Sequence, residues 1–281
     1  MLGCAYLLMT VSWVYAYAFE PWLDPHDKSL ECRILAVGHG GCAVVDLPSG
    51  EHLMYDAGGM GNPRSIADSI SRSLWYHRDC SIDHLILSHS DWDHCSAVPL
   101  LSQRFPLGSV WMPPSMWHHP EESMQVLCRN LAANARQVRC VTTGDRIQST
   151  PQATVRVLYP DARRSYPNDN ASSVVLLIES AGHRILFTGD LEHEGVRHLT
   201  SEPPLDVDIL MAPHHGSLDS EPQQICNWCK PEWVIVSGNL KSSQSALQNY
   251  RDCGAKVLHT AIHGSILIRF AENDVQVTAG Q

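Results

Sequence analysis

The sequence predicts an α/β (α+β) protein in which two β-rich halves form two facing sheets with helices on their outer surfaces. Short apolar runs of strand length recur along both halves of the chain, and segments with helical spacing lie between them. The length of 281 residues is also enough to bury one large core. We therefore expect one main domain over residues 31–281, preceded by a separate N-terminal segment.

The first half of the chain begins with short strands separated by turns that are rich in glycine or contain Pro-Ser-Gly. A helix is expected over residues 64–77, because Ile66, Ile70 and Leu74 recur at a spacing of four. The expected strands are 32–37, 42–47, 52–55, 84–88, 109–112 and 136–142, and the other expected helices are 95–105 and 121–133.

The second half repeats this alternation of strands and helices. A loop rich in Pro, Arg and Asn over 160–171 follows its first strand, and the turn at 180–183 joins two strands into a hairpin. The expected strands are 153–159, 173–179, 184–188, 207–211, 233–237, 256–259, 265–270 and 274–278, and the expected helices are 192–200 and 243–252.

Residues 89–94, His-Ser-Asp-Trp-Asp-His, are the strongest functional signal in the sequence. Two histidines and two aspartates follow directly after an apolar run, which indicates a buried strand that delivers a loop to a metal site. This ligand set suits Zn²⁺, or Mn²⁺ where carboxylates dominate. One ion rarely takes four ligands from so short a loop. Two neighbouring divalent ions can share it, and such a pair activates water for hydrolysis.

Two later motifs supply further ligands. Thr188-Gly189-Asp190 and Pro213-His214-His215-Gly216 each follow an apolar run. An aspartate has two oxygens and can bridge two ions. Three strands that end in ligand-type residues, in this order, predict a dinuclear metal site.

These motifs together resemble the metallo-β-lactamase superfamily, and most closely the C-terminal hydrolase domain of ComEC-type competence proteins. Asp91 stands where many superfamily members carry a histidine, as it does in that subgroup. The resemblance covers residues 31–271 and implies a four-layer αββα sandwich. The loop Val37-Gly38-His39-Gly40-Gly41 departs from the subgroup, because an acidic residue is lost and His39 is gained.

The resemblance and the ligand chemistry together give an expected assignment of the site. His89 and Asp91 hold one ion, Asp93 and His94 hold the second, and Asp190 bridges them. His215 completes the second site by analogy with a His-Gly step in related proteins. We expect Asp93, His214 and His215 to be catalytic, with Asp56, Asp169, Asn170 and His39 as supporting or additional candidates.

Several of these candidates have roles that stay open at this point. Asp56 resembles the first acidic motif residue of the superfamily and is expected to brace the metal loop by hydrogen bonds. Asp169 or Asn170 stands where the superfamily often places a third ligand for the first ion. His214 either protonates a leaving group or packs against the metal loop.

The charge of the chain limits the choice of substrate. Lys and Arg number 20 against 30 Asp and Glu, for a net charge of −10, which disfavours nonspecific binding to a polyanion. A nuclease needs a local basic patch, and the candidates are Arg129, Arg136, Arg139, Arg163 and Arg164, whose alternative role is that of solvated surface arginines.

Three functions remain open from the sequence. The resemblance implies a DNA phosphodiesterase that acts in competence-related DNA uptake. A hydrolase of a small substrate, such as a lactone, thioester or phosphodiester, has the same ligands. A non-catalytic accessory domain of a transport assembly is the third interpretation, because the altered loop around His39 removes part of the subgroup pattern.

Residues 2–19 form an apolar stretch without a charged residue. Its length is close to the minimum for a bilayer, roughly 17 residues, and we expect a membrane helix. A cleaved secretory signal is the alternative, since Ala16-Tyr17-Ala18 resembles a cleavage site. The resemblance adds that further membrane helices belong to an upstream part of the protein or to a separate channel chain. Each interpretation places the catalytic domain outside the cytoplasm or at a membrane surface.

Overall fold

The computed structural model describes residues 29–271 and 274–280. The apolar stretch at 2–19, and with it the expected membrane helix or signal, lies outside these residues. Within the described part of the chain, no helix combines the length and the hydropathy that crossing a bilayer requires.

Across residues 29–271 and 274–280, fifteen strands form two mixed sheets. The first has the order β15 (Asp274–Ala279), β14 (Ile266–Ala271), β1 (Leu30–Ile34), β2 (Ala43–Asp46), β3 (His52–Tyr55), β4 (Ile82–Ile86), β5 (Leu107–Met112) and β6 (Ala135–Cys140). The second has the order β13 (Lys256–His259), β12 (Trp233–Val236), β11 (Ile209–Met211), β10 (His183–Phe187), β9 (Val175–Ser180), β8 (Ala153–Tyr159) and β7 (Arg146–Ser149).

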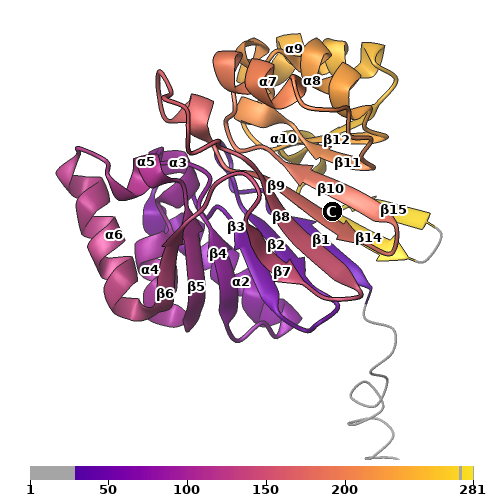
Figure 1. Ribbon diagram of the computed structural model, residues 1–281. Coiled ribbons are helices and arrows are strands. Elements are labelled where there is room, and N and C mark those ends of the chain that lie inside the picture. The colour runs from indigo at the N-terminus through magenta and orange to yellow at the C-terminus, as the bar shows by residue number, and fades with distance from the viewer. Residues whose placement is uncertain (1–28, 272–273, 281) are drawn as a thin grey trace, which may run out of the picture.

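Helices cover the outer faces of both sheets (Figure 1). On the first sheet they are α2 (Pro63–His77), α4 (Val98–Arg104) and α6 (Glu122–Asn134), and on the second α7 (His193–Thr200), α8 (Pro222–Cys229) and α9 (Leu240–Asp252). Short helical segments are α3 (Trp92–Cys95), α5 (Pro114–Trp117), η2 (Asn170–Ser172), η3 (Pro213–Gly216), η4 (Leu218–Ser220) and α10 (Thr260–His263).

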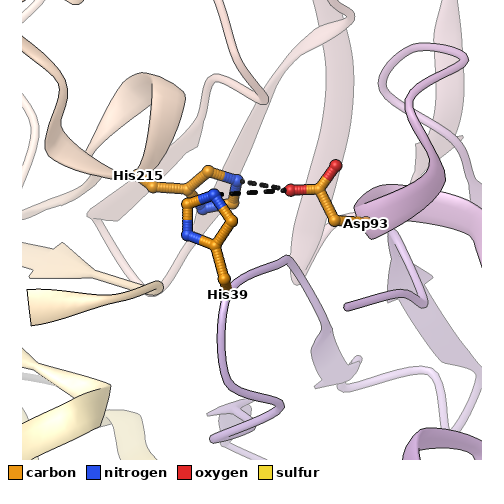
Figure 2. A group of neighbouring side chains, drawn as sticks. All are labelled: His39, Asp93 and His215. Carbon is orange, nitrogen blue, oxygen red and sulfur yellow. Dashed lines mark ion pairs between the residues drawn. The ribbon is translucent and has the colours of Figure 1, made fainter. Parts of the chain in front are cut away.

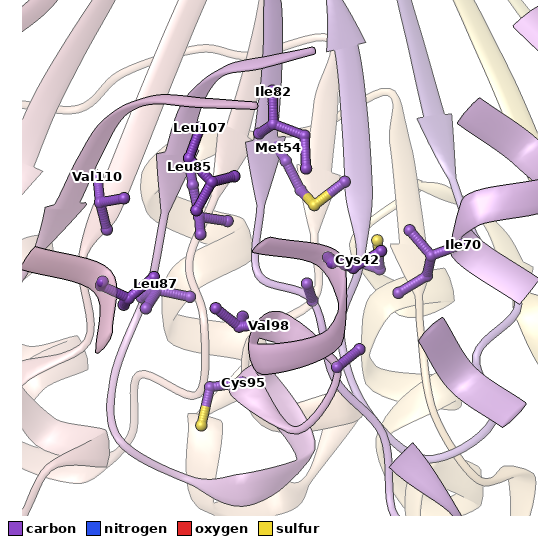
Figure 3. Packing of buried hydrophobic residues seen from close by; sticks show 14 of the residues in the cluster. Cys42, Met54, Ile70, Ile82, Leu85, Leu87, Cys95, Val98, Leu107 and Val110 are labelled. Atoms are coloured by element: carbon purple, nitrogen blue, oxygen red, sulfur yellow. The ribbon is translucent and has the colours of Figure 1, made fainter. Parts of the chain in front are cut away.

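Three buried hydrophobic clusters separate these layers. One lies between the first sheet and its helices, where Ile70 of α2 and Val98 of α4 face strand residues such as Leu85 (Figure 3). A second lies between the sheets, and a third lies under α7, α8 and α9. The predicted αββα sandwich is therefore confirmed, because three apolar interfaces require four layers.

Most predicted elements are present, and the structure adds helices α5, α8 and α10, which were not predicted. The helix expected over 95–105 is two helices, α3 and α4, and α3 begins at Trp92 inside the metal motif. Strand β7 was not predicted, because only Ile147 is buried and the segment carries no alternating pattern. Helix α9 begins at Leu240 rather than 243, since the Asn239 side chain accepts a hydrogen bond from the amide of Lys241 and caps the helix.

Strand direction brings the three metal motifs together. Strands β3 to β6 are parallel to one another in the first sheet, as are β10 to β13 in the second. The motifs follow the carboxyl ends of β4, β10 and β11. Polar loops from both sheets therefore gather at one edge of the sandwich.

A separate buried ion-pair network lies in the first sheet, around Arg33 of β1. Its guanidinium lies 2.6 Å from Asp79 and 2.9 Å from Asp46, and the Arg33 and Asp79 side chains are 4% and 3% exposed. His52 adds a hydrogen bond to Asp46 at 2.9 Å. This network ties β1, β2 and β3 to the end of α2.

Arg33→Met should lower the free energy of unfolding by about 3–5 kcal/mol, because it leaves the Asp79 carboxylate buried without its partner. Chemical denaturation measures the change. The matched control is Arg269→Met, which removes an ion pair to Glu31 whose arginine is 53% exposed and should cost less than about 1 kcal/mol. Equal costs in the two variants would contradict the structural role of Arg33.

Candidate metal centre

Six side chains of the predicted ligand set meet where the two sheets join. His89 follows β4, and Asp93 and His94 lie on α3, which begins after Asp91. Asp190 follows β10, and His215 lies on η3 after β11. His89, Asp93, His94, Asp190 and His215 are buried, whereas the Asp91 side chain is 52% exposed.

Three imidazoles are held by hydrogen bonds through their Nδ1 atoms. His94 Nδ1 lies 2.7 Å from Asp56 Oδ2, and His215 Nδ1 lies 2.8 Å from the carbonyl oxygen of Ser237. His89 Nδ1 lies 2.8 Å from Ser88 Oγ, whose own proton goes to Asp56 at 2.8 Å. Each acceptor requires a proton on Nδ1. The Nε2 atom of each neutral ring therefore carries a free lone pair.

These Nε2 atoms point toward one another and toward carboxylates. His94 Nε2 is 3.2 Å from His215 Nε2 and 3.0 Å from Asp190 Oδ1. His89 Nε2 is buried and has no hydrogen-bond partner. Two lone pairs at this separation repel, and an unpaired buried nitrogen is costly. Divalent cations would satisfy these atoms, so the residues fit the metal that the sequence implies.

The ligand atoms form two clusters, each within 4.8 Å. One contains His89, His94 and Asp190, and the other contains His39, Asp93 and His215 (Figure 2). His215 Nε2 and His39 Nε2 lie 3.2 and 3.9 Å from Asp93 Oδ2. This grouping differs from the expected pairs, because His94 lies in the same cluster as His89 and not with Asp93. Which ion each side chain holds stays a prediction.

The electrostatics of the site favour positive charge. Burial alone would lower the pKa of His94, but the carboxylates of Asp190 and Asp56 outweigh it and raise that pKa well above its usual value. Burial likewise opposes ionisation of Asp190, yet His94 and His215 hold the pKa of Asp190 well below its usual range. The cluster therefore attracts cations even though it is shielded from water.

The two candidates for a third ligand lie beside the clusters rather than in them. Asp169 accepts a hydrogen bond from Ser90 and lies 3.2 Å from His119 Nε2. Asp169, Asn170, His119 and Asp91 line a common cavity of about 520 Å³. The structure therefore places this group around the exposed side of Asp91.

The histidine pair separates into two environments. His214 and His215 have positive φ angles of 49° and 52°, an uncommon backbone conformation for residues other than glycine. This turn sends His215 into the cluster, while His214 Nδ1 lies 2.8 Å from Glu192 Oε2 and its Nε2 lies 4.0 Å from Asp190. His214 therefore sits at the rim, 27% exposed.

Sequence reasoning missed three supporting groups. Ser88 and Ser237 orient imidazoles, and Glu192 contacts His214. Serine next to a strand is common, so the first two carried no signal. Glu192 lies two residues after Asp190, and this proximity was the only available clue.

The expected basic patch is not continuous in the described residues. Arg139 lies over the Trp111 ring, while Arg136 lines a polar hollow with Glu51. Arg163 and Arg164 lie near Asp161. Arg136 and Arg139 lie on β6 of the first sheet, whereas Arg163 and Arg164 lie in the loop after β8 of the second.

Comparison with known proteins decides the family. A family profile described as "Metallo-beta-lactamase superfamily" matches residues 36–262. The chain belongs to the metallo-beta-lactamase superfamily. The solved structure of the metallo-beta-lactamase fold protein YhfI from Bacillus subtilis shares 11% identity with a TM-score of 0.58, and covers 89% of this chain and 100% of that one. This match supports the fold alone.

Curated relatives include ComE operon protein 3 of Bacillus subtilis (strain 168), 28% identical over 67% of this chain and 25% of its own length. Competence protein ComA of Neisseria gonorrhoeae is 25% identical over 80% and 30%. Endoribonuclease YSH1 of Gibberella zeae is 28% identical over 67% and 24%. The resemblance to competence proteins is thus confirmed, and the chain spans less than a third of the length of these relatives.

Asp56→Asn should lower the affinity for divalent metal by about 10- to 100-fold. The carboxylate accepts from the Ser88 amide at one oxygen and from Ser88 Oγ and His94 Nδ1 at the other. In either orientation of the asparagine amide, its NH₂ group would face a hydrogen-bond donor of Ser88 or His94, so at least one of these hydrogen bonds would be lost.

Titration with Zn²⁺ or Mn²⁺ in the presence of a competing chelator measures the affinity. Asp83→Asn is the control, because Asp83 accepts hydrogen bonds from His52 and Ser81 at the start of β4, away from the site. If both variants bind metal as the unaltered protein does, Asp56 does not orient the ligands.

Proposed function

We propose that this protein is a dinuclear metal-dependent phosphodiesterase that cleaves nucleic acid, with DNA as its substrate. The observation that carries this proposal is the convergence of three oriented Nε2 atoms with the carboxylates of Asp93 and Asp190 at one edge of the sandwich. The fold is that of a metallo-hydrolase. Relatives named as competence proteins and endoribonucleases support a nucleic-acid substrate.

Bound Zn²⁺ or Mn²⁺ would supply Lewis-acid activation of water and stabilise the charge that develops on phosphorus oxygens. His89, Asp91, Asp93, His94 and His215 would hold the two ions. Asp190 is suited to lie between them, since its Oδ1 faces His94 and its Oδ2 lies 3.4 Å from His215 and 4.0 Å from His89.

His214 is placed to move a proton during the reaction. Its Nδ1 faces Glu192 and its Nε2 points toward the rim of the cluster, where a leaving group would depart. A carboxylate behind an imidazole orients the ring and fixes which of its nitrogens faces the reacting groups. We therefore assign His214 the role of proton donor, and His215 that of ligand.

One observation favours a smaller substrate as the second candidate function. Several arginines are already paired with carboxylates, including Arg104 with Asp68, Arg163 with Asp161, and both Arg156 and Arg184 with Glu179. Pairing reduces the positive charge available to a polyanion. A small phosphodiester, lactone or thioester would bind without such an excess of free positive charge.

The proposed setting is a membrane, with the catalytic domain outside the cytoplasm. The support for this setting is the apolar composition of residues 2–19. A membrane channel, supplied by an upstream part of the same protein or by a separate chain, would be the partner that delivers DNA.

Metal-loaded protein should cleave labelled single- or double-stranded DNA, and Asp93→Ala and Asp190→Ala should each reduce the rate by at least about 10³-fold, since each removes several kcal/mol of charge stabilisation. Gel assays with and without chelator measure the rate. Metal content is determined on every sample. An intact protein with two bound ions and no cleavage of DNA or RNA would shift the function to a small substrate.

His214→Ala should lower kcat by about 10²- to 10⁴-fold while metal content is unchanged, because general acid catalysis contributes on that scale. His215→Ala should instead lose metal. The pair separates a proton donor from a ligand on adjacent residues. A substrate with a good leaving group, such as a nitrophenyl phosphodiester, should restore much of the rate in the His214 variant only. Loss of metal in both variants would assign His214 to binding.

A further inference from the structure

A cavity of about 680 Å³ lies on the second sheet, outside the metal centre. It is bounded by β7 and β8, by the first part of the loop 160–171, and by residues 198–205 at the end of α7. None of its lining residues belongs to the two ligand clusters. We call it the arginine cavity, after Arg146, Arg156, Arg163 and Arg164, which line it.

The charge of this cavity is opposite to that of the whole chain. Its four arginines face two lining carboxylates, Asp161 and Glu202, and Arg156 also pairs with Glu179, so the arginines outnumber the carboxylates in a protein whose net charge is −10. Cationic side chains repel one another, so an acidic protein gains nothing in stability by gathering them around a hollow. A local positive field of this kind concentrates anions.

These arginines retain donors for a ligand. Arg163 and Arg164 both lie on the single carboxylate of Asp161, at 2.9 and 3.6 Å. Arg156 uses Nε and Nη2 on Glu179, which leaves Nη1. Arg146 is exposed, and no carboxylate contacts it among the described residues. The guanidinium group suits phosphate because it offers several N–H donors in a fixed plane.

One buried polar atom at the cavity also has no partner. His198 lines the cavity, and its Nδ1 is buried without a hydrogen bond. Its Nε2 lies 3.5 Å from Glu194 on the same helix. A buried nitrogen without a partner is uncommon in folded proteins, and this one is shielded from solvent beside the cavity.

The remaining wall is apolar and rigid. Pro203, Pro204 and Leu205 line it together with Trp228. The indole N–H of Trp228 donates to the Glu202 carbonyl oxygen at 2.9 Å, which fixes the ring. Pro203 and Pro204 are exposed and offer flat surfaces that lose little entropy on binding, whereas Trp228 is only 6% exposed and anchors the neighbouring backbone. This wall suits a planar heterocycle rather than an ion alone.

We propose that the arginine cavity binds a nucleoside phosphate, with the phosphate on the arginine side and the base against the proline and tryptophan wall. The ligand is either a free mononucleotide or one nucleotide of a strand. The loop 160–171 joins the cavity to the metal centre, since Asp161 lines the cavity and Asp169 contacts Ser90. Only the second alternative, a nucleotide within a nucleic-acid strand, rests on the proposed nuclease function.

Isothermal titration of the full chain tests this proposal. The ligands are deoxyadenosine monophosphate, deoxyadenosine, inorganic phosphate and a short single-stranded oligodeoxynucleotide, all in chelator so that the metal centre contributes no phosphate affinity. Arg146→Ala should weaken binding of the monophosphate about tenfold, the effect of one charge-assisted hydrogen bond, and Arg146→Glu by at least as much. Deoxyadenosine and phosphate should each bind more weakly than the monophosphate.

Arg129→Ala is the matched control, because Arg129 is exposed on α6, on the other sheet. Mononucleotide binding that falls in the Arg146 variants alone supports a free nucleotide as ligand. Oligonucleotide binding alone, with the same dependence on Arg146, supports a contact for the strand. If neither the mononucleotide nor the oligonucleotide binds, or if the Arg129 variant loses binding equally, the proposal is overturned. The titration measures binding in chelator, so Asp190→Ala, which should abolish DNA cleavage, should not change it. The nucleotide-binding proposal and the nuclease proposal can therefore fail independently.

Discussion

The carboxylate of Asp56 is the interaction on which the metal centre depends. It accepts from the Ser88 amide, from Ser88 Oγ and from His94 Nδ1, and its backbone N–H donates to Ile86. One side chain therefore fixes the end of β4 and the orientation of two imidazoles. Its φ of 57° places it in the left-handed region, a strained conformation that the surrounding hydrogen bonds maintain.

The four-layer architecture supplies the rest of the geometry. His89, Asp93 and His94 come from the first sheet, while Asp190 and His215 come from the second. The cluster therefore exists only when the apolar interface between the sheets has formed. Cation binding and folding are coupled for this reason, since the ligands come from both sides of that interface. The negative potential of the site and the positive arginine cavity lie in different parts of one acidic molecule.

Periodicity was sufficient for most of the fold. The spacing of Ile66, Ile70 and Leu74 identified α2, and these three side chains are buried as expected. Strand β7 could not be predicted, because one buried residue leaves no pattern to detect. The start of α3 at Trp92 was also hidden, since a helix of four residues is shorter than the window in which helical spacing can be recognised.

For the site, the sequence by itself determined which side chains are candidate ligands, because His, Asp and their spacing after apolar runs are local properties. It also identified Asp56 as a brace through its family resemblance. Only the tertiary structure decided that His39 joins Asp93 and His215, that Asp169 turns to His119 and Ser90, and that Arg146 and Arg156 share a cavity with Arg163. These neighbours are far apart in the chain, and their proximity follows from strand order and sheet packing, which no local pattern encodes.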